Sequence, residues 1–351
     1  MPTSAQETEE EEDSIKTITE ITENSDQFEG LFTLYRDRET GETHMEITRE
    51  QLNHEFIYVA VSTDGVVQGG YCRGRYRDNR ILSLARHFNK IEIRSENTAF
   101  YFDPENPLSR AAHANISPGL LVSEPIVAED EETGTVLINV DEIFTSEALL
   151  QVKATPDPDE TPKDAFRLGN LSEDKSKITE IRNYPLNTDV HVEYVYENPA
   201  PVVQGDEEIT DSRYVSIYMQ HSFIAIPESD YESRFTDHRM GFFAQQITDL
   251  TDDSVTPYRD LVERWHLVKK DPTAEISEPI EPIVWWIENT TPIEFRDSIR
   301  EGVLAWNQSF EKIGFENAIV VRLQPNDAEW DAGDIRYNVL RWTSSPNPPF
   351  S

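Results

Sequence analysis

The chain has 351 residues, with 31 lysines and arginines against 67 aspartates and glutamates, which gives a formal net charge of −36 at pH 7. Such a charge repels phosphate backbones and anionic lipid heads, so we expect no nucleic-acid partner and no binding to a membrane surface. No apolar run approaches the roughly 18 residues that cross a bilayer, and the single cysteine, Cys72, cannot form a disulfide within the chain.

The first residues are strongly acidic, with an unbroken run of carboxylates from Glu9 to Asp13. A secretory signal has a basic start and an apolar middle, and this segment has neither. Acidic segments with few apolar residues bury too little surface to fold, so the sequence predicts a disordered acidic tail over residues 1–27. As written, the chain is expected to be cytoplasmic, or its export information lies elsewhere.

A series of short strands separated by turn residues follows the tail. In Val190–Tyr196, for example, the even-numbered residues are apolar or aromatic, whereas His191 and Glu193 lie on the opposite face. Many short strands of this kind predict a β-rich antiparallel N-terminal domain over residues 28–274. The other strand predictions are Leu31–Tyr35, His44–Ile47, Glu55–Ser62, Ile91–Arg94, Ala99–Phe102, Leu120–Val127, Thr135–Val140 and Tyr214–Ile226.

Turn and loop signals punctuate this domain. The glycines at positions 65, 69, 70 and 74 indicate a hairpin-rich region, and they lack the order of a nucleotide-binding loop. Residues 155–162 are rich in proline and acid and predict a surface loop or hinge, and Asn106–Asn115 is a candidate short helix. The segment 275–282, with prolines at 279 and 282, predicts a linker into a final unit over residues 283–351.

The final unit has the clearest pattern. The apolar run Ile283–Ile287 is typical of a strand buried on both faces, and Ala318–Leu323 and Asp334–Trp342 are two further strand candidates. Strand, long helix and strand in this order predict a crossover in a largely parallel sheet. Together with the β-rich domain, this predicts an α+β fold.

The helix of this unit has a predicted start and end. Thr291 is the expected N-cap, Pro292 occupies the first helical position, and Glu294 closes a capping box. Gly314 is expected to end the helix. The helix has one apolar face, which consists of Ile299, Val303, Trp306, Phe310 and Ile313. Trp306 is expected in the core beside Trp285 and Trp286.

Histidines are the first candidates for chemistry, and they stand at positions 44, 54, 87, 113, 191, 221, 238 and 266. No two are four residues apart, so no helix presents two imidazoles to one metal ion on one face. The segment from His54 to Tyr58 begins like the HExxH zinc signature but ends in tyrosine and lies in a strand pattern. We therefore interpret His54 as a half-exposed strand histidine rather than a metal ligand.

Cys72 lies among Arg73, Arg75 and Arg77, which would lower the pKa of a thiol and make it reactive or able to bind a partner's metal. A small, partly buried side chain is the interpretation we favour. Carboxylates are so numerous that a nearby pair indicates only a solvated face, and the common nucleophile, phosphate-loop and CxxC signatures are absent. The sequence thus predicts no catalytic, metal-binding or cofactor-binding residue.

Asp334, Arg336 and Asn338 alternate with the apolar residues of the last strand candidate. They would line a cleft, although polar alternation explains them without a function.

The last third of the chain resembles the beginning of the catalytic domain of a metzincin-type zinc metalloprotease, most closely that of the large bacterial "met-zincin" group. Those proteins carry a long β-rich N-terminal domain of unassigned function. The residues that carry the resemblance are Phe28–Tyr35, Arg239–Phe243, Arg264–Pro272, Pro282–Glu288, Phe295–Asn307, Gly314–Ile319 and Asp334–Trp342.

The resemblance implies an enzyme that hydrolyses peptide bonds of a peptide or protein substrate with zinc-activated water. It also implies that some proteins of this group are exported. Members of the group continue to a helix with the HExxH motif, which this chain lacks. We therefore expect an N-terminal fragment that is inactive alone and binds no zinc itself. The alternatives are a non-catalytic binding protein that pairs with a separately encoded catalytic half, or, without any supporting motif, an enzyme of another class.

Overall fold

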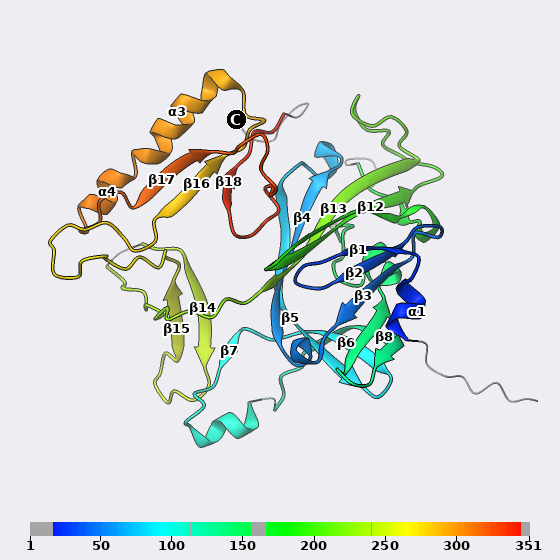
Figure 1. The fold of residues 1–351 in the computed structure, drawn as a ribbon, viewed down its shortest axis with the longest axis horizontal. Helices are drawn as coiled ribbons and strands as arrows, with labels where there is room; N and C mark the ends of the chain where they lie inside the picture. The colour runs from blue at the N-terminus through cyan, green and yellow to red at the C-terminus, as the bar shows by residue number, and fades with distance from the viewer. Residues whose placement is uncertain (1–16, 113, 156–165, 240, 345–351) are drawn as a thin grey trace, which may run out of the picture.

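The computed structural model describes residues 17–112, 114–155, 166–239 and 241–344, and strands dominate it (Figure 1). Twelve strands form one sheet, in which every neighbouring pair is antiparallel. The spatial order is β1-β2-β3-β9-β8-β6-β5-β4-β13-β12-β10, and β11 also pairs with β12. These strands are β1 Ser25–Phe28, β2 Leu34–Asp37, β3 Thr43–Ile47, β4 Glu55–Asp64, β5 Arg75–His87, β6 Lys90–Ser95, β8 Gly119–Asp130, β9 Thr135–Asn139, β10 Asn170–Leu171, β11 Lys177–Tyr184, β12 Asn187–Glu197 and β13 Tyr214–Ala225.

Alternation along the strands fills the interior of this sheet. In β4, Phe56, Tyr58 and Ala60 are buried while the residues between them are only partly covered. In β12, Val190 and Val192 are fully buried on one face. Successive side chains of a strand point to opposite faces, so each strand gives one apolar row to the core and one polar row to the outside.

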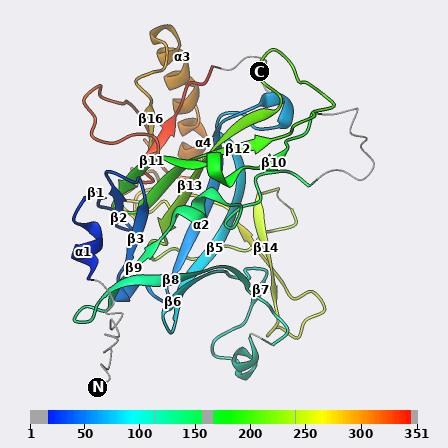
Figure 2. The same cartoon turned by 90° about the vertical axis from the view of Figure 1, so that its right-hand side faces the viewer.

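The two ends of the large sheet meet, and the sheet is therefore nearly a barrel (Figure 2). The Leu31 N–H donates to the Tyr184 carbonyl (2.9 Å), and the Phe32 N–H donates to the Thr188 hydroxyl (3.0 Å). Closure removes most of the exposed edge of a sheet. The short helix α2, Asp141–Thr145, contacts β11 and β12 and buries two apolar side chains in the core.

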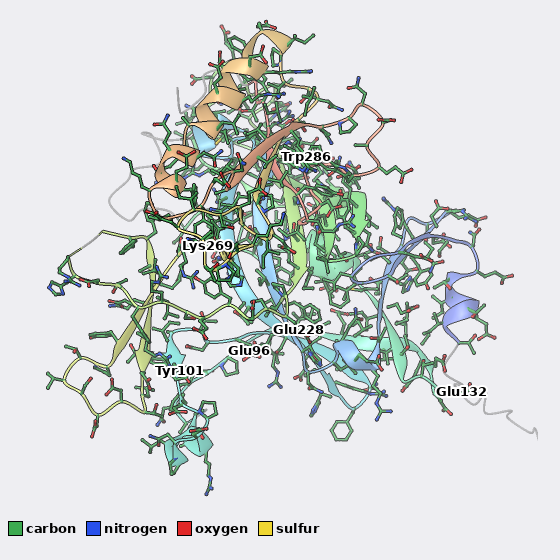
Figure 3. The ribbon with its side chains drawn as sticks, turned by 60° about the vertical axis from the view of Figure 1, so that its left-hand side comes forward. Glu96, Tyr101, Glu132, Glu228, Lys269 and Trp286 are labelled. Atoms are coloured by element: carbon green, nitrogen blue, oxygen red, sulfur yellow. The ribbon has the colours of Figure 1, made fainter. Side chains whose placement is uncertain are left out.

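A second sheet has the order β15-β14-β7, from β7 Phe100–Tyr101, β14 Ala244–Asp249 and β15 Tyr258–Val262. The β14–β15 hairpin is antiparallel, whereas β14 and β7 are parallel. The Arg259 guanidinium lies 3.9 Å from the ring centre of Tyr101 and links the hairpin to β7 (Figure 3). The sequence analysis predicted β7 but not this hairpin, whose alternation is weak.

The third sheet is the predicted final unit and has the order β17-β16-β18, with β16 Ile283–Ile287, β17 Ile319–Leu323 and β18 Asn338–Leu340. Both neighbouring pairs are parallel, as the crossover pattern predicted. The helices α3, Ile293–Leu304, and α4, Asn307–Glu311, run along the side of this sheet that faces away from the large sheet (Figure 1). At the coarse level the α+β, β-rich class is confirmed. The remaining short helices are α1 Ile18–Thr22 and the 3-10 turns Arg49–Gln51, Val67–Gly69, Pro107–Ala111 and Glu173–Lys175.

The predicted long helix differs from the structure in three ways. Helix α3 begins one residue later, and Pro292 is its N-cap without a side-chain hydrogen bond, so the capping box does not form. The helix is interrupted between α3 and α4, and Trp306 at the break is 65% exposed rather than part of the core. Gly314, with φ of +93°, does lie at the predicted end.

Other boundaries also moved. Strand β18 is shorter than predicted because Asp334–Tyr337 forms a turn. Strand β5, the longest of the chain, and β11 were both missed. The predicted tail over 1–27 is too long, since α1 and most of β1 fall inside it, whereas residues 1–16 lie outside the described residues.

The predicted hinge and the predicted linker can be compared with the structure to different extents. The predicted hinge at 155–162 lies almost wholly outside the described residues. The predicted linker is anchored, because Ser277 pairs with Phe315 in a parallel bridge and Lys269 donates to the Glu275 carbonyl (2.7 Å). Across the described segments, no helix is both long and apolar enough to span a bilayer.

Candidate functional site

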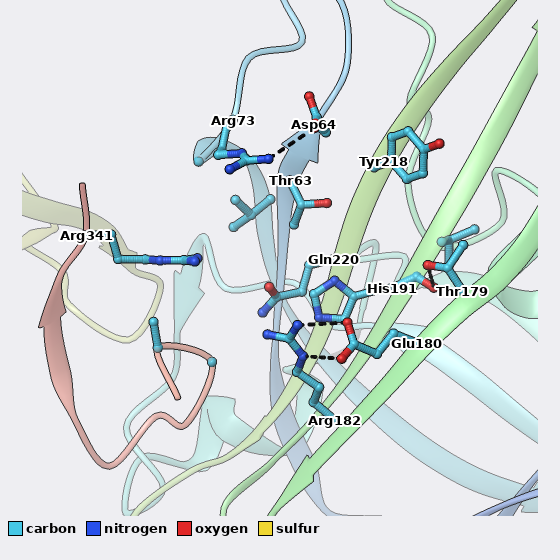
Figure 4. A pocket seen from close by; sticks show the side chains of 15 residues that line it. Thr63, Asp64, Arg73, Thr179, Glu180, Arg182, His191, Tyr218, Gln220 and Arg341 are labelled. Atoms are coloured by element: carbon cyan, nitrogen blue, oxygen red, sulfur yellow. Dashed lines mark hydrogen bonds and ion pairs between the residues drawn. The ribbon is translucent and has the colours of Figure 1, made fainter. Parts of the chain in front are cut away.

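A polar cavity of about 380 Å³ lies on the outer face of the large sheet (Figure 4). Its floor and walls come from β4, β11, β12 and β13, and the segment after β17 covers one side with Ala332, Gly333 and Arg341. A concave site with a few converging polar groups is the usual form of a small-molecule site. Its charged or hydrogen-bonding side chains are Thr63, Asp64, Arg73, Thr179, Glu180, Arg182, His191, Tyr218, Gln220 and Arg341.

Strand register brings the centre of this cavity together. Glu180 of β11 lies opposite His191 of β12, and His191 lies opposite Gln220 of β13. Residues directly opposite each other on antiparallel strands share a face and touch. His191 therefore stands in the middle of a polar row, on the face of β12 that the sequence alternation assigned to it.

Arg182 organises the charges below His191. Its guanidinium donates to both carboxylate oxygens of Glu180 (2.8 Å each), and its Nη1 lies 3.3 Å from the Asp331 carboxylate. These bonds lower the pKa of Glu180, chiefly through the hydrogen bond from Arg182. All three nitrogens of Arg182 are thus engaged, and Glu180 stays ionised.

The imidazole of His191 is left without a partner. Its Nε2 is buried and has no hydrogen-bond partner in the described part of the chain. Burial, and next the positive charge of Arg182, lower the pKa of His191. The ring is therefore neutral at pH 7, with one donor and one acceptor to offer. The Nε2 atom is enclosed by protein, so this unsatisfied polar atom costs stability in the folded chain.

The loop that covers one side of the cavity, residues 331–335 (the cavity loop), is hydrogen-bonded to β11 and β12. Tyr184 Oη donates to Asp331 (2.7 Å), and the Asn187 amide donates to the Gly333 carbonyl (2.9 Å). The Ile335 N–H in turn donates to the Asn187 side-chain carbonyl (3.1 Å). A Cβ at position 333 would lie 2.8 Å from an oxygen of Asp189, so only glycine allows the loop to approach this closely.

Asp189 lies beneath that loop and is buried. It accepts hydrogen bonds from Asn187 (2.9 Å) and Gln220 (2.9 Å). Burial nevertheless dominates and raises the pKa of Asp189 to about 6. The carboxylate is ionised at pH 7 at a cost in stability.

A second histidine, His221, is fully buried inside the large sheet. Tyr58 Oη lies 2.7 Å from its Nδ1, and Tyr194 Oη lies 2.9 Å from its Nε2. Tyr194 donates its own proton to the Phe144 carbonyl (2.6 Å), so it can only accept from His221. The ring therefore carries its proton on Nε2 and accepts from Tyr58 at Nδ1. Burial lowers the pKa of His221 to about 3, which makes this a neutral structural network.

The residues singled out from the sequence do not form a site. His54 is exposed just before β4, whereas Tyr58 is buried in the core. The two ends of the HExxY segment therefore do not face the same space. Cys72 is buried, and the neighbouring Arg75 and Arg77 donate to backbone carbonyls. His113 lies outside the described residues.

The polar residues of the last strand are not cleft residues either. Asp334 is buried in a turn and paired with Arg336 (2.6 Å), and the Asn338 amide donates to the Val284 carbonyl (3.0 Å). Trp285 and Trp286, predicted in the core of a strand buried on both faces, are only partly buried, and Trp286 packs against Trp330 and Tyr337. Of the cavity residues, His191 had been noted as part of a strand's polar face, Arg73 only as a neighbour of Cys72 and Gly74 only as a hairpin glycine.

Zinc, which the resemblance implies, has no fitting set of donors on these residues. Within the described ranges, no three His, Cys, Asp or Glu side chains come together in a group that could hold a metal ion. Both ring nitrogens of His221 are taken by tyrosines. We therefore derive no chemical step through zinc from this chain.

Comparison with known protein families assigns a large part of the chain to one family. Residues 74–270 match the family "Domain of unknown function (DUF5117)", and this match covers more than half of the chain. The chain therefore belongs to the DUF5117 family. The match runs from just before β5 to the segment before the linker and contains β11, β12 and β13 of the cavity. No curated protein and no solved structure matches the chain.

Proposed function

We propose that the chain is the N-terminal part of a bacterial zinc-dependent metallopeptidase of the metzincin-like group. In this proposal the β-rich domain carries, and holds in place, the first β-α-β-β elements of a catalytic domain. The observation that carries it is the separate parallel sheet β17-β16-β18 with its helices α3 and α4. Its elements follow the chain order that the resemblance implies.

The surface of this unit supports the proposal. Ile293 is 78% exposed, Trp306 65% and Ile313 66%, all of them on or beside α3 and α4. Phe295 and Trp342 stack on each other with ring centres 4.9 Å apart and are both partly exposed. Large apolar side chains that are exposed on one unit indicate a place where other structure packs. Further elements of a catalytic domain would cover them.

The docking of the unit also supports the proposal. The cavity loop attaches the parallel sheet to β11 and β12 through the hydrogen bonds of Asp331, Gly333 and Ile335. A catalytic domain needs its first strands held at a fixed place, because reacting groups must be aligned to within a fraction of an ångström. The β-rich domain would supply this rigid support. Zinc ligands and the catalytic base would come from residues outside this chain.

A binding protein without catalysis is the second candidate. The same exposed apolar surface would then pair with a separately encoded catalytic half. The polar cavity, which is built largely by the DUF5117 region, gives such a protein a surface of its own for recognition.

The reading frame downstream of codon 351 separates the two candidates. A continuation that encodes HExxH, in frame or after a frameshift, supports the peptidase proposal. A stop codon followed by unrelated sequence overturns it and supports the binding protein. For the latter, co-purification with a neighbouring HExxH-containing protein is the confirming measurement.

A further inference from the structure

The cavity around His191 has features of a ligand site that the peptidase proposal does not use. Every carboxylate at its rim is already engaged: Glu180 pairs with Arg182, and Asp64 pairs with Arg73 (3.2 Å). A cation would therefore find no free carboxylate there. The unsatisfied groups are donors.

Two arginines hold these free donors on opposite sides of the cavity. Arg73, from the loop after β4, uses Nη2 for Asp64, and its Nε and Nη1 have no partner among the described residues. Arg341, just after β18, uses Nε for Glu288 (3.2 Å) and keeps both terminal nitrogens. Figure 4 shows the Arg341 guanidinium extended towards Gln220 in the middle of the cavity. Guanidinium groups with free parallel donors match oxyanions in geometry and charge.

Three arginines line the cavity against two carboxylates, although Asp331 and Glu288 pair with two of these arginines from outside the lining. At physiological salt, charges more than about 8 Å away are largely screened. The net charge of −36 therefore matters less to a ligand in the cavity than the arginines that touch it.

We propose that this cavity binds a small oxyanion, the carboxylate or phosphate group of a small molecule, between Arg341 and Arg73 above the His191 ring. The cavity of about 380 Å³ lies within the range of small-molecule sites. His191 lines the cavity between the two arginines. Because Arg341 and Gly333 come from the final unit and the rest from the large sheet, the ligand joins the two. The proposal does not depend on the peptidase lineage.

Titration calorimetry on the 351-residue chain tests this with succinate, inorganic phosphate and succinamide. Succinamide has nearly the shape of succinate without its charge. Saturable binding of succinate, phosphate or both, with no binding of succinamide, is the expected result, and the stronger of the two anions identifies the group. Absence of saturable binding by either anion at millimolar concentration overturns the proposal, as does equal binding of succinamide.

Substitutions place the ligand. Arg341→Gln and Arg73→Gln are each expected to weaken anion binding about tenfold or more, since a hydrogen bond to a charged group is lost. The matched control is Arg213→Gln: Arg213 is 58% exposed, as Arg341 is, and also pairs with one carboxylate, but it lies outside the cavity. Binding within about twofold of the wild type is expected for this control. Unchanged affinity in both cavity variants overturns the proposed site.

Discussion

The large sheet and the final parallel sheet differ in how far they bury their own apolar side chains. In the large sheet, Phe32, Leu34, Ile47 and Leu82 are fully buried, and the strands close on one another. Among the described residues of the parallel sheet only Ile283, Ile287 and Ile319 are buried, and of these only Ile287 is fully buried. A closed sheet covers its own apolar face, whereas a three-stranded open sheet needs neighbours. The large sheet is thus a complete core, whereas the parallel sheet leaves large apolar side chains exposed.

The largest expected effect contrasts two aromatic residues, one from each region. Phe223, 1% exposed, contacts the rings of Phe32, Tyr58 and Phe144. Phe223→Ala is expected to lower the free energy of unfolding by about 3–5 kcal/mol, because it leaves a cavity. Trp306→Ala, at 65% exposure, is expected to change it by no more than about 0.5 kcal/mol. Urea denaturation measures both, and similar losses for the two variants would contradict the contrast.

Acid should act on the closed core through His221. The folded state lowers the pKa of His221 from 6.5 to about 3, so the folded state binds fewer protons than the unfolded state. The stability that His221 contributes is present above pH 6.5 and is lost as pH falls towards 3, by about 1.4 kcal/mol per pH unit. Unfolding free energies of the wild type and His221→Gln between pH 4 and 7 measure this. Parallel curves for the two proteins would refute it.

Asp189, beneath the loop that joins the two regions, should act with the opposite sign. Its folded-state pKa of about 6 lies above the ordinary value of 3.8, so the folded state holds this proton more tightly. The stability it contributes is present below pH 4 and is lost as pH rises through 6, by about 3 kcal/mol. Asp189→Asn should remove this loss. If the difference in unfolding free energy between variant and wild type stays constant from pH 4 to 7, the expected effect is absent.

A smaller effect is expected at the contact between the regions. Asp331→Asn removes the charge that faces Arg182, and both side chains are partly exposed, so the expected cost is about 0.5 kcal/mol. Amide hydrogen exchange should speed up in β18 and the cavity loop while β4 and β13 keep their protection. Equal acceleration in β4 would show that the two regions do not open separately.

The weakest effect concerns the surface of the parallel sheet. The chain is expected to associate and to bind a dye specific for apolar surfaces, despite its charge, because Trp306 and Ile313 are exposed. Replacing both by serine should reduce association and dye binding with little change in folding stability. A monodisperse wild-type monomer without dye binding would count against an uncovered surface.

Strands with strong alternation were predictable from the sequence. Strands β4, β12, β13 and β16 lie where alternation or an apolar run placed them. Strand β5 was missed because Arg75–Arg80 is almost wholly polar, yet it pairs between β4 and β6 and leaves that polar stretch mostly uncovered. Here pairing with two neighbours overrides weak local propensity.

The cavity could not be predicted, since its parts meet only through strand order. Val61, His191 and Gln220 are neighbours because β12, β13 and β4 pair in sequence-distant register. Gly333 has no local turn requirement that marks it, and its need to be glycine comes from Asp189, 144 residues earlier by number. The polar face of β12 was the one visible signal.

The most direct test of the peptidase proposal compares the 351-residue chain with the same chain extended by its downstream reading frame. Bound zinc per chain and cleavage of a protein substrate are measured for both. The account predicts no zinc and no cleavage for the 351-residue chain, and about one zinc per chain with chelator-sensitive cleavage for the extended one. Zinc and cleavage in the 351-residue chain alone, or neither in the extended chain, would contradict it.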